Sequence, residues 1–310
     1  MEPLKIAIIG AGNIGASSAA AMVERGLGRV FLHDVDSDLA AGKAMDVNHA
    51  AAYFHNNSRV VPCSSLSDLD GARIVVIAAG APRRIGMKRR DLLGENMATC
   101  LSVGEYLHAN CRDARVLVVT NPVDALTTQM KLQWPDMMVF GLGCTLDTIR
   151  LRYLLAEAAG VSVDAVDAMV IGSHNDRMIP LIRHATIDGA PLPQRLTGEQ
   201  IDRAIDHTRK AGHFIVEKLK SRGSFYAASF CVAAIVAAIA RNRREVFPVS
   251  VRCEGQYGIC GPSVALPCIV GAAGAERIVE LKLNDHELAA LADCAADIRE
   301  AVGQTERCRH

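Results

Sequence analysis

Residues 4–15 read LKIAIIGAGNIG. The apolar run Leu4–Ile9 predicts a buried strand, and a G-x-G-x-x-G pattern follows it and opens a helical stretch. Gly10 permits a tight turn, Gly12 lets a pyrophosphate approach the backbone, and Gly15 lets helix and strand pack closely. In a chain with 25 glycines the pattern alone is weak. Because the pattern lies between a predicted strand and a predicted helix, it predicts a dinucleotide-binding site.

Asp34 ends the second predicted strand, where a carboxylate can accept both hydroxyls of an adenosine ribose. A 2′-phosphate would be repelled there, so Asp34 favours NAD over NADP, although Asp36 or Asp38 can blur that choice. The alternative for Asp34 is a strand-end turn or a helix cap. The cofactor contacts predicted from this region are Gly10, Ala11, Gly12, Asn13, Ile14, Gly15 and Asp34.

Up to about residue 140, short apolar runs alternate with helix-like stretches, which is typical of a parallel sheet covered on both faces. The predicted strands are Leu4–Ile9, Arg29–His33, Ile74–Ala78, Val116–Thr120 and Met138–Phe140, and the predicted helices are Ile14–Arg25, Ser37–Ala51 and Asn96–Asn110. We therefore expect an α/β fold with a Rossmann-type doubly wound parallel sheet in an NAD-binding domain, residues 1–142.

After Gly143 the pattern becomes mixed, which predicts an α+β substrate-binding domain over residues 143–310. Its expected elements are a helix Leu146–Ala159 stopped by Gly160, a strand Ala165–Ile171, a hairpin turning at Asp188-Gly189, helices Glu199–Lys220 and Phe225–Ala240, strands near Val246–Tyr257, and a last helix after the capping box Asn284–Glu287.

The composition argues against two kinds of partner, nucleic acids and membranes. Lys+Arg and Asp+Glu both number 34, so no global field attracts nucleic acid or an anionic membrane. The longest apolar run, Phe225–Ala240, is shorter than the roughly 20 residues of a membrane span. The start of the chain shows no signal-peptide pattern. We expect a soluble, cytoplasmic protein that binds neither nucleic acid nor a membrane.

Ten cysteines include no C-x-x-C pair, and no H-E-x-x-H stretch occurs. A chain of 310 residues has no need of disulfide staples. We expect reduced, structural thiols and no metal site.

Arg83 and Arg89 lie in a loop that follows the predicted strand Ile74–Ala78. A guanidinium matches a carboxylate bidentately, so two of them predict a small dicarboxylate substrate. The alternative is a solvated basic loop, because five cations fall within residues 83–90.

Three further segments carry candidate chemistry. Asn121 follows the fourth predicted strand, Asp147 and Arg150 share a helix face, and His174 sits in a loop after a strand. Each has a structural alternative: a turn, a helical ion pair or a satisfied loop histidine.

Taken in order, G-x-G-x-x-G, the Arg83…Arg89 loop, T-N-P-V-D at 120–124, L-D-x-x-R at 146–150 and G-x-H-x-D at 172–176 resemble the lactate/malate dehydrogenase family. The similarity covers nearly the whole chain and is greatest to the lactate-dehydrogenase-like branch of malate dehydrogenases. It implies His174 as proton donor and acceptor, Asp147 as its orienting partner, and Arg150 as the clamp for a substrate carboxylate. It also implies that Arg89 polarises the reacting carbonyl from a closing loop and that Arg83 selects the substrate.

By the same resemblance, Asn121 contacts nicotinamide and substrate, while Val119 and Asn96 line the cofactor site. The implied reaction is NAD-dependent, reversible oxidation of (S)-malate to oxaloacetate by a homodimer or homotetramer, with the Ala-rich run at 225–240 as a possible interface. The alternatives are an L-lactate or other 2-hydroxyacid dehydrogenase, and a catalytically silent NAD-binding protein. Short-chain dehydrogenase chemistry is excluded, because no tyrosine has a lysine four residues later.

The chain departs from the family pattern around the histidine and in the arginine loop. Ser173 and Asn175 flank His174, Arg177 replaces a small residue, and Pro82 precedes Arg83. Asparagine tolerates a positive φ better than most residues, so the histidine loop can be retained. These departures bear on geometry and rate, not on the class of reaction.

Overall fold

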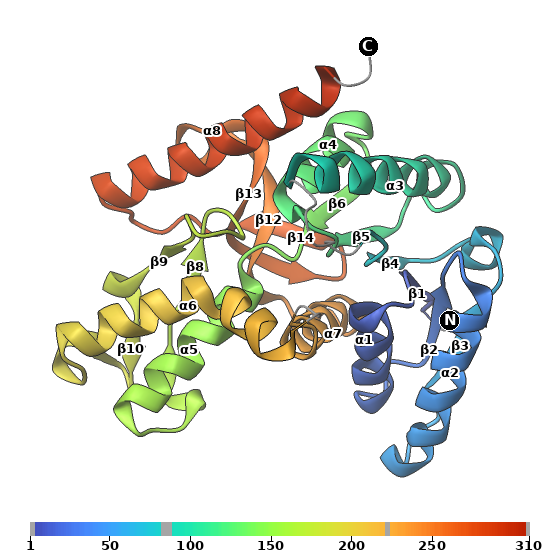
Figure 1. The fold of residues 1–310 in the computed structure, drawn as a ribbon, viewed down its shortest axis with the longest axis horizontal. Helices are drawn as coiled ribbons and strands as arrows, with labels where there is room; N and C mark the ends of the chain where they lie inside the picture. Colours follow the sequence, from blue (N-terminus) through green and yellow to red (C-terminus); the bar gives the residue numbers. More distant parts are fainter. Residues whose placement is uncertain (1–3, 82–88, 221–223, 308–310) are drawn as a thin grey trace.

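The computed structural model describes residues 4–81, 89–220 and 224–307. Its main feature is a sheet in the order β14-β13-β12-β6-β5-β4-β1-β2-β3 (Figure 1). From β3 to β6 the strands run parallel, and β12 to β14 continue the sheet antiparallel. The bounds are β1 (Ile6–Ile9), β2 (Arg29–His33), β3 (Arg59–Cys63), β4 (Ile74–Ile77), β5 (Arg115–Val118), β6 (Met138–Gly141), β12 (Glu245–Glu254), β13 (Cys260–Gly271) and β14 (Gly274–Ile278).

Helices cover both faces of this sheet (Figure 1). On one face α1 (Asn13–Glu24) packs against α2 (Ser37–Ala51) and α7 (Tyr226–Ala240). On the other, α4 (Val123–Gln133) packs against α3 (Arg89–Asn110) and α8 (Asp285–Arg307). Because both faces are covered, β1 and β4 are buried at every position and read as continuous apolar runs. The Rossmann-type order 3-2-1-4-5-6 confirms the predicted fold class.

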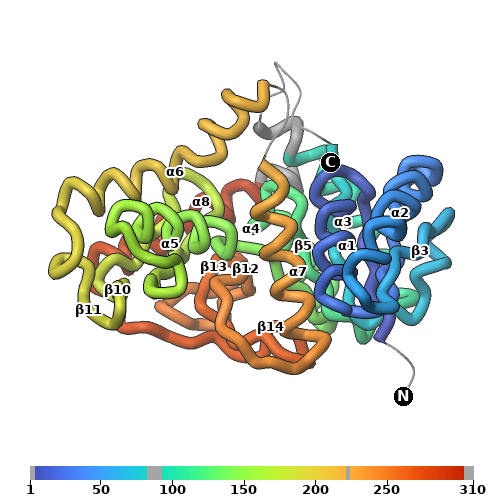
Figure 2. The backbone as a smooth tube through the Cα atoms, turned by 90° about the horizontal axis from the view of Figure 1, so that it is seen from below, coloured from blue at the N-terminus to red at the C-terminus, as the bar shows by residue number. Residues whose placement is uncertain are grey.

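A smaller body of helices and short strands lies at the end of the molecule remote from α1 and α2 (Figure 2). Helices α5 (Thr145–Ala159) and α6 (Gly198–Leu219) pack on each other and share a separate apolar cluster that includes Leu151 and Leu155. The strands are β7 (Val166–Asp167), β8 (Val170–Ile171), β9 (Ile179–Pro180), β10 (Thr186–Ile187) and β11 (Ala190–Pro191). The turn at Asp188-Gly189 joins β10 to β11 as predicted.

One strand prediction needs correction, and two strands were not predicted. The strand expected at Ala165–Ile171 is divided, because β7 pairs with β10 while β8 pairs with β9. Strand β3 was not predicted, and it contains Pro62, which an edge strand tolerates. The long strand β13 was also missed.

Two prolines explain why β13 is hard to recognise. Pro267 of β13 lies directly opposite Pro248 of β12, so neither strand offers an N–H at that point. Their carbonyls are satisfied elsewhere: Pro248 O accepts from Cys144 N at 3.0 Å, and Pro267 O accepts from Val279 N at 2.7 Å. Since both proline carbonyls find donors, the prolines do not break the sheet.

Local signals for helix ends are seen as predicted. Gly160 ends α5 in the left-handed conformation, with φ of 67°. Asn284 and Glu287 form the capping box of α8 through two hydrogen bonds of 2.8 Å. Among the described helices, none combines the length and apolar character that a membrane crossing requires. The domain boundary at residues 142/143 stays a prediction, since the main sheet takes strands from both sides of it.

Candidate active site

The glycine turn between β1 and α1 is shaped by close backbone contacts. A Cβ on Gly10, where φ is +107°, would lie 2.6 Å from Ala79 N. A Cβ on Gly15 would lie 1.8 Å from the carbonyl oxygen of Gly10. A Cβ on Gly12 would meet nothing within 4 Å, and no side chain caps the start of α1. The turn therefore leaves open space and uncapped N–H groups, which fit a phosphate group.

Asp34 is held rigidly at the end of β2. Its Oδ2 accepts from Ala11 N at 2.6 Å, and its Oδ1 accepts from Asp36 N at 3.0 Å. Each carboxylate oxygen can accept a further hydrogen bond from a ribose hydroxyl. Val35, which the sequence analysis did not single out, is fully exposed beside it. The sequence signal that could have pointed to Val35 as a neighbour of the site is its position directly after Asp34, at the end of β2.

Asn96 joins the loops after β4 and β5. Its Oδ1 accepts from Ala81 N at 2.7 Å, and its Nδ2 donates to Asn121 O at 2.7 Å. Asn96 is buried, so both ends of its amide are used inside the protein. It fixes the backbone that carries Asn121, and a direct contact with a cofactor stays a prediction.

His174, Asp147 and Arg150 meet at the start of α5. His174 Nδ1 lies 2.6 Å from Asp147 Oδ2, and Arg150 Nη1 donates to Asp147 Oδ1 at 3.3 Å. The carboxylate is fully buried, whereas the imidazole and guanidinium side chains keep 21% and 13% exposure. Asp147 thus fixes the imidazole through Nδ1 and leaves Nε2 for a reacting group.

The surroundings of His174 change its protonation. Burial alone lowers the pKa of His174, but the charge of Asp147, its hydrogen bond and the charge of Asp124 outweigh burial and raise it. Arg150 opposes this shift in part. The imidazole therefore holds its proton to higher pH than an ordinary histidine.

Asp124 of α4 is a site residue whose role the sequence analysis missed. Its Oδ2 accepts from the backbone N–H of His174 at 2.9 Å. Burial raises the pKa of this carboxyl, and the hydrogen bond from His174 opposes the shift. The signal was a carboxylate in a buried helical segment directly after Asn121, but its partner is 50 residues away.

A cavity of about 210 Å³ lies beside His174 and Arg150. Val119, Asn121, Arg150 and His174 line it, together with Ile14 from the start of α1. Gly212 and Val216 of α6 form another wall. Three of the predicted cofactor residues, Ile14, Val119 and Asn121, therefore share one cavity with Arg150 and His174 at the carboxyl ends of the parallel strands. The glycines of the turn, Asp34 and Asn96 do not line it.

The structure describes the whole histidine loop but only part of the arginine loop. Arg83 lies outside the described residues. Arg89 was predicted in a loop, but the structure makes it the first residue of α3 and describes only its backbone. In the histidine loop the positive φ, +94°, belongs to Gly172. Asn175 Oδ1 accepts instead from Arg177 N at 2.8 Å, and the guanidinium of Arg177 pairs with Asp297 of α8 at 3.1 Å. The side chains of the unusual loop residues thus help to order the loop.

A glycine turn with open space for a phosphate and a histidine paired with a buried aspartate lie at the carboxyl ends of the parallel strands. Sites of this kind serve the transfer of a hydride together with a proton, so the class is that of dinucleotide-dependent oxidoreductases. Family models agree: residues 4–137 match the lactate/malate dehydrogenase NAD binding domain, and residues 144–308 match the lactate/malate dehydrogenase alpha/beta C-terminal domain. The chain belongs to the lactate/malate dehydrogenase family and is an NAD-dependent oxidoreductase.

Individual relatives fall on both sides of the family. A malate dehydrogenase of Caulobacter vibrioides is 37% identical over 316 aligned positions, covering 100% of this chain and 98% of the relative. The crystal structure of Cryptosporidium parvum malate dehydrogenase superposes with a TM-score of 0.94 at 33% identity, covering 98% and 99% of the chains. A lactate dehydrogenase from the same organism, complexed with lactic acid and nicotinamide adenine dinucleotide, also gives 0.94, at 30% identity and 99% coverage of each chain.

Proposed function

We propose that this enzyme catalyses the NAD-dependent, reversible oxidation of (S)-malate to oxaloacetate. The observation that carries the proposal is the 2.6 Å contact of His174 with buried Asp147, beside Arg150 in one cavity. The sequence relatives named malate dehydrogenase support the choice of substrate.

The proton step is assigned to His174. In the oxidation direction Nε2 accepts the proton of the substrate hydroxyl, and in reduction it returns that proton to the forming alkoxide. Asp147 keeps the other ring nitrogen protonated and stabilises the imidazolium that forms. NAD, when bound, supplies the acceptor for the hydride that leaves C2 of malate and, as NADH, the donor for the reverse step.

Substrate binding is assigned to arginines. Arg150, held by Asp147 and lining the cavity, binds the carboxylate next to the reacting carbon. Arg89 polarises the reacting carbonyl, Arg83 binds the second carboxylate, and Asn121 orients the substrate oxygen. The roles of Arg83 and Arg89 rest on sequence alone.

The cofactor is assigned to the glycine turn and its neighbours. Uncapped N–H groups at the start of α1 receive the pyrophosphate, and Asp34 receives the ribose. Val119, Asn121 and Asn96 complete the nicotinamide end. The full set of proposed cofactor contacts is Gly10, Ala11, Gly12, Asn13, Ile14, Gly15, Asp34, Asn96, Val119 and Asn121.

Lactate dehydrogenase activity is the second candidate, because the structural similarity to the C. parvum lactate dehydrogenase is equally high. It is disfavoured by Arg83. Pyruvate lacks the second carboxylate, and a buried cation without its partner costs roughly 1–3 kcal/mol or more.

The assigned role of His174 is tested by His174→Asn, with the exposed His49→Asn on α2 as control. We expect turnover of oxaloacetate with NADH to fall at least about a hundredfold in His174→Asn only. NADH binding, followed by fluorescence, is expected to persist in both variants. Retained turnover in His174→Asn contradicts the mechanism, and absence of turnover in the wild type favours the silent NAD-binding alternative.

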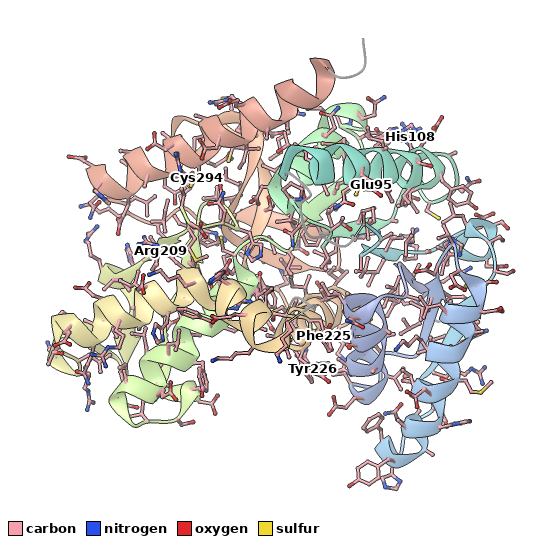
Figure 3. The ribbon with its side chains drawn as sticks, in the orientation of Figure 1. Glu95, His108, Arg209, Phe225, Tyr226 and Cys294 are labelled. Carbon is pink, nitrogen blue, oxygen red and sulfur yellow. The ribbon has the colours of Figure 1, made fainter. Side chains whose placement is uncertain are left out.

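We further propose that the chain assembles as a homodimer or homotetramer. Ile149 and Tyr153 of α5 and Phe214 of α6 border an apolar groove of about 390 Å³. Tyr226, labelled at the start of α7 in Figure 3, and Phe230 of the same helix are further exposed apolar side chains. Large exposed apolar patches of this kind are typical of subunit contacts.

A further inference from the structure

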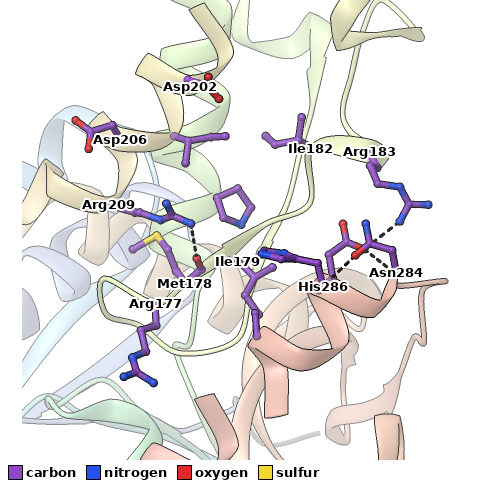
Figure 4. A pocket seen from close by; sticks show the side chains of 14 residues that line it. Arg177, Met178, Ile179, Ile182, Arg183, Asp202, Asp206, Arg209, Asn284 and His286 are labelled. Atoms are coloured by element: carbon purple, nitrogen blue, oxygen red, sulfur yellow. Dashed lines mark hydrogen bonds and ion pairs between the residues drawn. The ribbon is translucent and has the colours of Figure 1, made fainter. Parts of the chain in front are cut away.

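A second cleft, of about 480 Å³, lies between α6, the first turn of α8 and the segment that follows the histidine loop (Figure 4). It shares no lining residue with the catalytic cavity. Its volume falls within the range of small-molecule sites in proteins. The cleft is therefore a separate place in which a ligand of metabolite size fits.

Part of the cleft lining is apolar. Ile179 and Pro180 of β9, Ile182 after them, Ile205 of α6 and Ala290 of α8 contribute to it. An apolar body on a ligand would gain burial against these side chains.

Two side chains on the walls offer hydrogen-bond donors that no ion pair uses. Arg209 of α6 and His286 of α8 both line the cleft, and neither forms an ion pair with a described residue (Figure 4). The hydrogen bond from Arg209 Nη2 to Met178 O measures 3.5 Å, at the outer limit for such a bond. Most donors of this guanidinium are thus available to a ligand.

The other arginines of the cleft are already engaged. Arg183 pairs with Glu287 at 3.1 Å, and Arg177 pairs with Asp297 at the same distance. His286 lies in the first turn of α8, which also carries Asp285 and Glu287 and is closed by the capping box of Asn284 and Glu287. Among the described lining residues, the unpaired positive charge is therefore that of Arg209, and His286 adds a ring N–H donor.

The acidic residues of the cleft limit the charge of a ligand. Glu287 is used by Arg183 and by the N–H of Asn284, and Asp206 pairs with Lys210 at 2.7 Å. Asp202 has no ion-pair partner among the described residues. Its negative charge disfavours a second acidic group, so polyphosphates and dicarboxylates fit less well than a monoanion.

We propose that this cleft is a second ligand site, which binds a small organic anion with one acidic group and an apolar body. The acidic group lies between Arg209 and His286, and the body lies on the isoleucines and Pro180. The site is distinct from the binding of substrate and NAD, and its test does not depend on turnover.

Benzoate and its neutral isostere benzamide make a matched pair of probes. In ligand-observed NMR titrations at constant ionic strength, we expect benzoate to bind with a dissociation constant of about 1 mM or tighter and benzamide at least about tenfold more weakly. Arg209→Gln and His286→Gln are each expected to weaken benzoate about tenfold. Asp202→Asn is expected to tighten it.

Two control variants locate the binding. Arg203 lies on the same helix, pairs with Glu199 and does not line the cleft. Arg203→Gln should therefore leave benzoate binding unchanged. Arg150→Gln changes the catalytic cavity and should also leave it unchanged. Unfolding temperatures establish that each variant is folded. Absence of benzoate binding, equal binding of benzamide, or loss in Arg150→Gln with retention in Arg209→Gln overturns the proposal.

Discussion

Asp147 is the residue on which the site geometry depends most. One of its oxygens contacts His174 and the other accepts from Arg150, so a single buried carboxylate orients the proposed proton carrier and the proposed carboxylate clamp. A buried charge is stable only when it is paired and hydrogen-bonded, and here both oxygens have partners. Removing the charge should therefore affect both neighbours.

Asp147→Asn tests this at the residue scale. Because Asp147 raises the pKa of His174, ketone reduction, which needs a proton on Nε2, should decline in the wild type only as pH rises through that raised pKa. In the variant the decline should begin at lower pH, and kcat/KM should fall about a hundredfold or more. The pH profile of kcat/KM for reduction checks both. An unshifted profile contradicts the role of Asp147.

The glycine turn allows a matched comparison. Gly15→Ala should destabilise the fold, because its Cβ would lie 1.8 Å from Gly10 O. Gly12→Ala should leave the unfolding temperature nearly unchanged, since its Cβ meets nothing within 4 Å, yet weaken NADH binding about tenfold or more by filling the space for the pyrophosphate. Thermal unfolding and fluorescence titration measure the two effects. Equal NADH affinity in Gly12→Ala and the wild type would remove the pyrophosphate from this turn.

At the scale of elements, α4 ties the histidine loop to the antiparallel strands. Asp124 accepts from His174 N at 2.9 Å, and one turn later Thr128 Oγ1 accepts from Ser263 N of β13 at 2.8 Å. Both hydrogen bonds have backbone donors; the first is partly buried and the second is buried. Only the first lies at the proposed catalytic residue.

Variants of these two hydrogen-bond acceptors separate an effect on the free energy of unfolding from an effect on catalysis. Asp124→Ala and Thr128→Val each leave a backbone N–H without its acceptor, which should lower the free energy of unfolding by about 1–3 kcal/mol. Asp124→Ala should also lower kcat at least about tenfold, because the loop that carries His174 loses its anchor. Chemical denaturation and steady-state kinetics measure the two quantities. If both variants lose kcat equally, α4 has no specific role at the histidine.

Elements with strong local signals were predictable from sequence. Helix α2 and strand β2 have the predicted bounds, and the ends of α5 and α8 follow from Gly160 and the Asn284–Glu287 capping box. Strand β13 was missed because the reason it tolerates Pro267 is non-local. The facing proline and the donors Cys144 N and Val279 N come from other parts of the chain.

At the scale of the molecule, the residues named for chemistry came from separate motifs, and the fold brings the described ones together. His174 and Asp147 are 27 residues apart and in contact. The Asp124–His174 bond could not be predicted, because a buried carboxylate reads as a helix residue until its backbone partner is known. The side-chain positions of Arg83 and Arg89 remain predictions.

The assembly is also a prediction at this scale. Light scattering should give a mass of twice or four times the 33.2 kDa chain. Tyr153→Glu places a charge in the apolar groove and should lower that mass, because burying an unpaired charge is costly. Val163→Glu, an exposed apolar position that does not line the groove, should not change it. A monomeric wild type contradicts the proposed assembly.

The central claim concerns the substrate, and one comparison tests it most directly. We would measure kcat/KM for NADH-dependent reduction of oxaloacetate and of pyruvate, in the wild type and in Arg83→Gln. The account predicts a preference for oxaloacetate of about a hundredfold or more that collapses in the variant. A wild-type preference for pyruvate, or a preference for oxaloacetate that Arg83→Gln leaves intact, would contradict it.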